Sequence, residues 1–267
     1  MSSTLLITKT PFELEKLRAD LATRHKYSSL RKMYKKSYKE IKDLNSPGFW
    51  DNLNQTSTIL KTQNPIAWNR LNHVARLIPD SSKSVLDIGF GSASLEDIVF
   101  ESKNKKDYNW FGIDISPKSV KYASQKYPFA KFNIGSIDKL NFKLNSFDCV
   151  IVLEVLEHIS PSKTFSALSE TKRVLKSKGY LIVSVPLNEG LKDMIKVGKN
   201  PNAHVRIYTP DLIKAELKIT GFEIIKTKKL YAFHTHNQLK SLLSDFLNLV
   251  GIRVRLPNNI ILIARKI

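Results

Sequence analysis

Residues 84–96 constrain the fold of this chain more than any other segment. They begin with a short β-branched and apolar run, as in a strand buried on both faces: Val85, Leu86 and Ile88. Gly89 and Gly91 follow, and glycine permits a tight turn and a close approach of the backbone to a ligand because it has no Cβ. From Ser94 onward apolar residues recur at helical spacing. The segment therefore predicts a strand, a glycine turn and a helix N-terminus, whose free amide N–H groups suit a nucleotide-type ligand.

The glycine pattern distinguishes two classes of cofactor. A dinucleotide-binding fingerprint requires a third glycine at position 94, where this chain has Ser94. Here an acid, Asp87, lies two residues before the first glycine, and the string D-I-G-F-G-S-A (87–93) resembles the D-x-G-x-G-x-G signature of class I S-adenosylmethionine (SAM) methyltransferases, with alanine at the last glycine. The resemblance implies that SAM is the cofactor, that Asp87 belongs to the network around its methionine amino end, and that Gly89 and Gly91 admit it.

Two later turns extend this cofactor site. Asp114 ends a predicted strand about 20 residues past the glycines, where an acid grips the hydroxyls of a ribose. The next turn is Gly135-Ser136-Ile137-Asp138. In the methyltransferase family the equivalent turn carries an acid for the adenine amino group, and Ser136 stands at that position. Adenine recognition then falls to Asp138 or to the backbone at Ile137.

The string S-F-D-C-V-I-V-L-E-V-L-E-H-I (146–159) resembles the fourth-strand motif of small-molecule class I methyltransferases, including the ubiquinone-biosynthesis type. Leu153, at the end of this predicted strand, is assigned to the cofactor site. A catalytic base is needed only if the acceptor must lose a proton. The candidates are Glu154, at the strand tip, His158, just beyond it, and His204, in an H-x-R-x-Y-T segment that recurs at the mouth of the family's site.

The resemblance covers residues 84–186 well and implies a Rossmann-like α/β fold. We expect a seven-stranded sheet with the last strand antiparallel, helices on both faces and an N-terminal helical extension. Residues 1–63 are predicted to form a basic helical cap and residues 64–267 the SAM-binding domain. Within that domain, residues 231–258 form an insertion with an amphipathic stripe and are a candidate lid.

Composition excludes several other classes. The single cysteine, Cys149, excludes an internal disulfide framework and a thiolate zinc cluster, and it fits a reducing cytoplasm. No segment approaches the ~20 apolar residues of a membrane span. His234 and His236 alternate onto one predicted strand face, but without further ligands nearby we expect no metal site. The sequence therefore predicts a cytoplasmic, metal-free protein, of unknown oligomeric state.

The net charge of +19, from 43 Lys and Arg against 24 Asp and Glu, leaves the acceptor open. Cations and tyrosines are interleaved over residues 24–42, a pattern that can bind nucleic acid but also occurs on a solvated helix face. The main hypothesis is methyl transfer to an oxygen, nitrogen or carbon atom of a small-molecule or lipid-like acceptor. The alternatives are an RNA methyltransferase, or a non-catalytic protein of the same fold that binds RNA or anionic surfaces.

Overall fold

The chain folds around one mixed sheet of seven strands, in the order β3-β2-β1-β4-β5-β7-β6. The computed structural model describes residues 44–55, 65–102, 108–160, 163–188, 197, 200, 202–231, 246–247 and 256–267. The strands are β1 (Ser84–Ile88), β2 (Asn109–Asp114), β3 (Lys131–Ile134), β4 (Phe147–Leu153), β5 (Leu175–Pro186), β6 (Phe222–Leu230) and β7 (Asn259–Lys266). The first five are parallel, and β7 runs antiparallel to both β5 and β6. The predicted seven-stranded sheet with an antiparallel last strand is confirmed.

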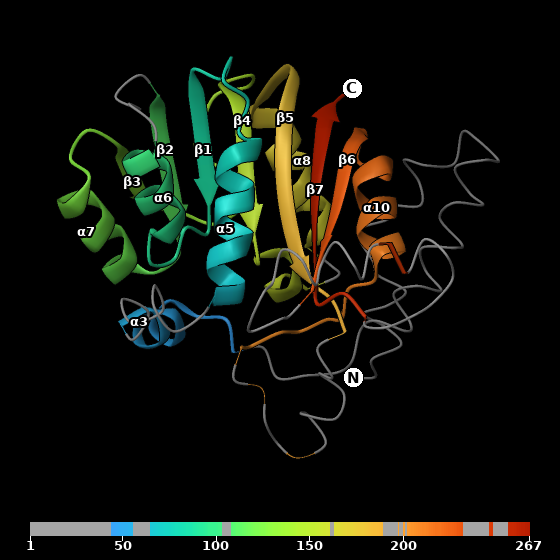
Figure 1. Cartoon of the computed structure of the whole chain (residues 1–267). Coiled ribbons are helices and arrows are strands. Elements are labelled where there is room, and N and C mark those ends of the chain that lie inside the picture. Colours follow the sequence, from blue (N-terminus) through green and yellow to red (C-terminus); the bar gives the residue numbers. More distant parts are fainter. Residues whose placement is uncertain are drawn as a thin grey trace.

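Helices cover both faces of this sheet (Figure 1). They are α3 (Pro47–Gln55), α5 (Pro65–Leu77), α6 (Ser94–Ser102), α7 (Pro117–Lys126), the short 3-10 helix η2 (Leu156–His158), α8 (Thr164–Val174) and α10 (Pro210–Ile219). The cores divide the same way: α5, α6 and α7 contribute to one apolar cluster, α8 and α10 to the other. Two helix starts are set by local sequence, because Ser116 and Thr209 cap α7 and α10 with their hydroxyls and a proline follows each.

The central strands are apolar because each of their faces meets a helix layer. In β4, Val150 and Val152 pack into the α8–α10 core, whereas Cys149 and Ile151 pack into the α5–α7 core. All four side chains are fully buried, which explains why the sequence shows a continuous apolar run rather than alternation. Cys149 is thus a buried core residue.

One predicted turn is wrong. The Lys178-Gly179 pair in the sequence predicts a turn before a strand that begins at Tyr180, but both residues lie inside β5, which begins at Leu175. The pairing of β4 with β5 shifts register at this point, and Lys178 adopts a left-handed φ of 59°. The local turn signal therefore corresponds to a bulge within a strand.

Several sequence predictions lie outside the described residues. They comprise nearly all of one or two amphipathic helices predicted over residues 11–44, nearly all of a short helix predicted near 191–197, the histidine pair at 234 and 236, and most of the 231–258 insertion. Across the part of the chain that the structure describes, every helix is too short or too polar to traverse a lipid bilayer.

Asp148, near the start of β4, contacts the start of the neighbouring strand β1, and we expect this contact to make the free energy of unfolding depend on pH in the acidic range. Its Oδ2 accepts hydrogen bonds from the backbone N–H groups of Lys83 (3.0 Å) and Ser84 (2.9 Å), and its Oδ1 accepts one from Lys176 Nζ (2.8 Å). Burial raises the pKa of Asp148, but these donors outweigh it and lower the pKa to about 2 from an ordinary 3.8. The bound form is therefore the ionised one, so its stabilisation is complete above about pH 4 and is lost as the pH falls towards 2.

Asp148→Asn should accordingly lower the midpoint of urea unfolding at neutral pH. The difference in midpoint between the variant and the unchanged protein should disappear between about pH 4 and pH 2. Glu223→Gln is the control, because Glu223 forms an exposed ion pair with Arg265 that contributes little. A gap that stays constant down to pH 2 would show that the ionised carboxylate is not what stabilises this end of the sheet.

Candidate active site

A pocket of about 250 Å³ opens at the carboxyl ends of β1, β2 and β4, close to the lower limit of the ~300–1,000 Å³ typical of small-molecule sites. Open parallel sheets bind ligands at this edge. The lining residues are Asn45, Trp50, Ile88, Gly89, Gly91, Asp114, Ile115, Gly135, Ser136, Ile137, Asp138, Glu154, Val155, His158, Ile159, Ser160 and Lys163. α3 lies beyond this edge of the sheet, beside the strand ends (Figure 1).

The glycine turn gives the pocket a wall made of backbone. Gly89 has a φ of +74°, and a Cβ there would lie 2.5 Å from Cγ2 of Val155. Gly91 also has a positive φ, of 57°. Ala93 occupies the same left-handed region with a φ of 57°, which explains why the family signature has a glycine at this position. An alanine in this conformation costs about 1–2 kcal/mol.

Asp114 lies at the end of β2 with its carboxylate held by two amides. Oδ2 accepts a hydrogen bond from Gly91 N (2.9 Å) and Oδ1 accepts one from Ser116 N (2.8 Å). Burial raises the pKa of Asp114, and these two amides oppose the increase. An ionised carboxylate has about four acceptor positions. The two amides therefore do not use all of them, and acceptor positions remain for ligand hydroxyls in the pocket, such as those of a ribose.

Asp87 lies behind the glycine turn rather than in the pocket wall, and its side chain is 2% exposed. Its neighbour is Glu96 of α6, which is fully buried and accepts a hydrogen bond from Trp110 Nε1 (3.0 Å). Burial raises the pKa of both acids, that of Glu96 to about 7, and the charge of Glu96 raises that of Asp87 further. A buried pair of this kind favours retaining a proton at neutral pH.

The turn after β3 forms another part of the wall. Ser136 donates a hydrogen bond to Asp138 Oδ1 (2.5 Å), and Lys163 Nζ lies 3.3 Å from Asp138 Oδ2. The hydrogen bond from Ser136 lowers the pKa of Asp138 and keeps it ionised. An acid is thus present at this end of the pocket although it is absent from position 136.

Glu154, at the tip of β4, has both carboxylate oxygens engaged. Arg70 of α5 lies 2.8 Å from Oε2, and Oε1 accepts hydrogen bonds from Ser184 Oγ (2.7 Å) and Asn259 Nδ2 (2.9 Å). Its backbone adopts a φ of 54°. Glu154 therefore joins three elements at the pocket wall.

His158 lines the pocket next to Trp50 of α3. The rings of Trp50 and His158 meet edge to face with centroids 4.8 Å apart. Asn45 Nδ2 donates to the carbonyls of His158 (3.3 Å) and Ala203 (3.0 Å). Within α3, Asp51 Oδ1 accepts hydrogen bonds from Ser116 Oγ (2.5 Å) and Lys118 N (3.1 Å). The α3 segment (residues 45–55) is therefore anchored at two points beside the pocket, at Asn45 and at Asp51.

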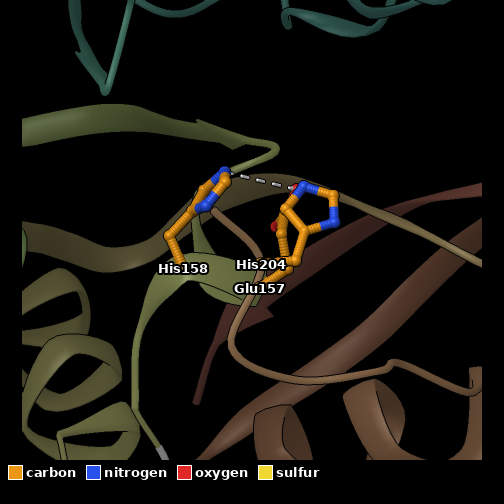
Figure 2. A group of neighbouring side chains, drawn as sticks. All are labelled: Glu157, His158 and His204. Atoms are coloured by element: carbon orange, nitrogen blue, oxygen red, sulfur yellow. Dashed lines mark ion pairs between the residues drawn. The ribbon is translucent and has the colours of Figure 1, made fainter. Parts of the chain in front are cut away.

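His204 lies behind His158, away from the pocket surface. Their ring centroids are 4.8 Å apart, and Figure 2 shows both imidazoles gathered with the carboxylate of Glu157. His204 is 6% exposed and Glu157 is fully buried. Burial, together with the neighbouring His204, lowers the pKa of His158 to about 3, so its imidazole is neutral at physiological pH.

The structure brings seven of the ten residues chosen from the sequence into the pocket wall: Gly89, Gly91, Asp114, Ser136, Ile137, Glu154 and His158. Asp87, Leu153 and His204 do not line it. Ile115 and Val155 were missed, although each directly follows a predicted site residue on the same loop. Asn45 and Trp50 carried no motif, and their contacts depend on tertiary structure alone. Glu157 was missed although it belongs to the quoted E-H pair.

Comparisons with known proteins agree with this site. A family model described as a methyltransferase domain matches residues 86–183. An uncharacterised protein of Methanocaldococcus jannaschii is 31% identical over 147 residues, which are 55% of this chain and 58% of that protein. A carboxy-S-adenosyl-L-methionine synthase of Campylobacter hominis is 29% identical over 116 residues, 43% of this chain and 48% of that enzyme. The chain thus spans about half the length of the curated relatives it matches.

A solved structure supports the fold. A protein of Thermotoga maritima, described as a SAM-dependent methyltransferase and possible histamine N-methyltransferase, has a TM-score of 0.61 at 15% identity, covering 82% of this chain and 99% of that one. The residues present fit SAM: the backbone wall at Gly89 admits no side chain, and Asp114 presents acceptors only, which suits ribose hydroxyls. SAM is accordingly the cofactor that this domain implies. Residues 86–183 thus match a methyltransferase domain, and the chain shares its fold with a SAM-dependent methyltransferase.

Proposed function

We propose that the chain transfers a methyl group from SAM to an oxygen, nitrogen or carbon atom of a small-molecule or lipid-like acceptor. One observation carries the proposal: the α3 segment is anchored beside the pocket, so that Trp50 and His158 enclose the space next to Asp114. This cover, over a pocket that also holds the cofactor, suits a compact acceptor better than a folded RNA. Methyl transfer needs the acceptor, methyl carbon and sulfur in line, so enclosure contributes directly to the rate.

SAM, when bound, supplies a methyl group that its sulfonium already activates. The chain itself needs to orient two molecules and exclude water, and orientation of this kind is worth several kcal/mol. Asp114 and the backbone at Gly89 are proposed to hold the cofactor. Trp50 and Val155 are proposed to exclude water from the acceptor side.

Among the catalytic candidates, we propose that only His158 contacts the acceptor. Glu154 contacts Arg70, Ser184 and Asn259, and we propose that it holds the pocket wall in place rather than contacting the acceptor. His204 contacts the His158 ring and is proposed to act only by positioning it. Both nitrogens of His158 face protein oxygens, with Nδ1 3.4 Å from the Ala203 carbonyl and Nε2 4.0 Å from Glu157 Oε1. This arrangement favours an orienting role for the ring over proton abstraction.

The domain division is also a proposal. Residues 1–63 are proposed to form the cap and residues 64–267 the SAM-binding domain, with 231–258 as a lid. The described part of the cap, α3, supports this division because it packs on α7 and contributes Trp50 to the pocket.

The test is methyl transfer by the intact chain. The protein is incubated with methyl-labelled SAM and fractionated host lysate, and the label is followed into metabolites, lipid, protein and RNA. We expect S-adenosylhomocysteine to form and the label to enter metabolites or lipid. With the Asp114→Asn variant we expect neither result. Label in RNA would replace the proposal with the RNA methyltransferase alternative, for which residues 24–42 supply the cations. No label in any fraction would favour the non-catalytic alternative.

The Campylobacter relatives suggest one more product to measure. Their name specifies synthesis of carboxy-SAM, and the similarity covers 116 residues. Mass spectrometry of the cofactor after incubation distinguishes the reactions, because methyl transfer leaves S-adenosylhomocysteine whereas the other reaction leaves a carboxylated SAM. Carboxylated SAM as the main product would overturn the proposed acceptor class.

A further inference from the structure

Three potential metal ligands converge beside the pocket: Glu157, His158 and His204 (Figure 2). Two come from η2, directly after β4, and the third comes from the segment before α10. A hydrogen bond from Val205 N to the carbonyl of Glu157 (3.0 Å) joins the two segments. The cluster is therefore fixed by backbone contacts as well as by its side chains.

The distances exceed those of hydrogen bonds but fit a shared ion. His158 Nε2 is 4.0 Å and His204 Nε2 is 3.9 Å from Glu157 Oε1, beyond the ~3.2 Å limit of an N–H···O hydrogen bond. All three ligand atoms lie within 4.8 Å of one another. Ligands at about 2.0–2.2 Å from a tetrahedral zinc ion are roughly 3.4 Å apart. Coordination would require the two edges to Glu157 to shorten by about 0.5–0.6 Å and an edge of 4.8 Å by about 1.4 Å.

The chemistry of the three groups is that of a transition-metal site. Glu157 is fully buried, and buried carboxylates are among the groups that coordinate metal ions. Two imidazoles and one carboxylate form a set found at catalytic zinc sites, whereas magnesium prefers oxygen ligands.

The surrounding loop orients the ligands as an outer shell would. The Ala203 carbonyl lies 3.4 Å from His158 Nδ1, which leaves Nε2 to face Glu157. Asn200 clamps His204, accepting from its N–H (3.1 Å) and donating to its carbonyl (3.0 Å). Ala203 adopts a left-handed φ of 53° directly before His204. Non-glycine residues adopt this conformation rarely, and such strain concentrates at functional sites.

We infer that Glu157, His158 and His204 bind one divalent transition-metal ion of the zinc class. Because His158 also forms the pocket wall, the ion would lie one side chain away from the acceptor space. This inference does not require the proposed methyl transfer, since metal binding is measured on its own.

The test uses Co²⁺, whose visible absorption reports both binding and geometry at a zinc-type site. Metal-stripped full-length protein without a purification tag is titrated with Co²⁺, and Zn²⁺ is then added. We expect one equivalent of Co²⁺ to bind with the intense absorption of a four-coordinate site, and Zn²⁺ to displace it. Loss of an outer-shell partner already weakens metal binding about 10–100-fold, so His204→Ala and Glu157→Gln should each weaken it ~100-fold or more.

Two controls make the result specific. His73→Ala removes a histidine of α5 outside the cluster and should leave Co²⁺ affinity unchanged. The double variant His234→Ala and His236→Ala removes the other histidine pair and should also bind normally. S-adenosylhomocysteine binding is measured for every variant to establish that it is folded. The inference is overturned if the unchanged protein gives only the spectrum of hexaaqua Co²⁺, or if the folded Glu157→Gln protein binds Co²⁺ as tightly as the unchanged one.

Discussion

Asp114→Asn is expected to weaken SAM binding by about 100-fold or more. Each hydrogen bond to a charged group is worth roughly 1.5–3 kcal/mol, and the variant loses the charge that accepts the two proposed bonds from the ribose hydroxyls. The carboxylate presents acceptors only, and two of its positions are already used by Gly91 N and Ser116 N. An asparagine side chain has one acceptor oxygen in place of two, so it cannot satisfy both amides and two ribose hydroxyls. The measurement is calorimetric titration with SAM and with S-adenosylhomocysteine.

A matched control separates this effect from a general loss of structure. Asp148→Asn makes the same chemical change at the opposite end of the sheet, away from the pocket. It should lower stability without changing the affinity for SAM. Asp114→Asn should also lose some stability, so binding is compared at a temperature where both variants are folded. Equal affinities in the two variants would remove Asp114 from the cofactor site.

The strand–glycine–helix unit could be predicted because its determinants are local. β1, the turn at Gly89 and the start of α6 at Ser94 follow one another within a few residues, and each depends on side-chain type alone. The acid at Asp114 could be placed for the same reason: it ends a short strand next to β1. Parallel order then brings the two strand ends together without further information.

The acceptor side could not be predicted in this way. The contact between Asn45 and His158 joins residues 113 positions apart, and no periodicity in either segment indicates it. The turn signal at Gly179 was misleading because a bulge and a turn both require a residue that tolerates close backbone contacts; a Cβ there would lie 2.9 Å from the Lys176 carbonyl. The cluster around Glu157 depends on the path of the 200–208 segment, which the motifs leave undefined.

Arg206→Met is expected to lower the free energy of unfolding by about 3–5 kcal/mol, the cost of leaving a buried charge without its partner. Arg206 and Glu216 are both fully buried and form an ion pair through Nη2 and Oε1. Nη1 donates to Thr164 Oγ1 (2.5 Å), and the guanidinium lies 4.3 Å from the centre of the Tyr208 ring. The Tyr208 hydroxyl donates to Glu216 Oε2 (2.8 Å). This network connects α8, α10 and the segment that carries His204.

The double variant Arg206→Met with Glu216→Leu provides the decisive comparison. Removing both charges leaves neither one isolated, so the double variant should be more stable than either single variant, although Thr164 and Tyr208 each lose one hydrogen bond. The midpoints of urea unfolding give the interaction energy by a double-mutant cycle. If the two single losses simply add, Arg206 and Glu216 stabilise the fold independently. The network would then contribute through packing rather than through charge, and the position of His204 would not depend on the ion pair.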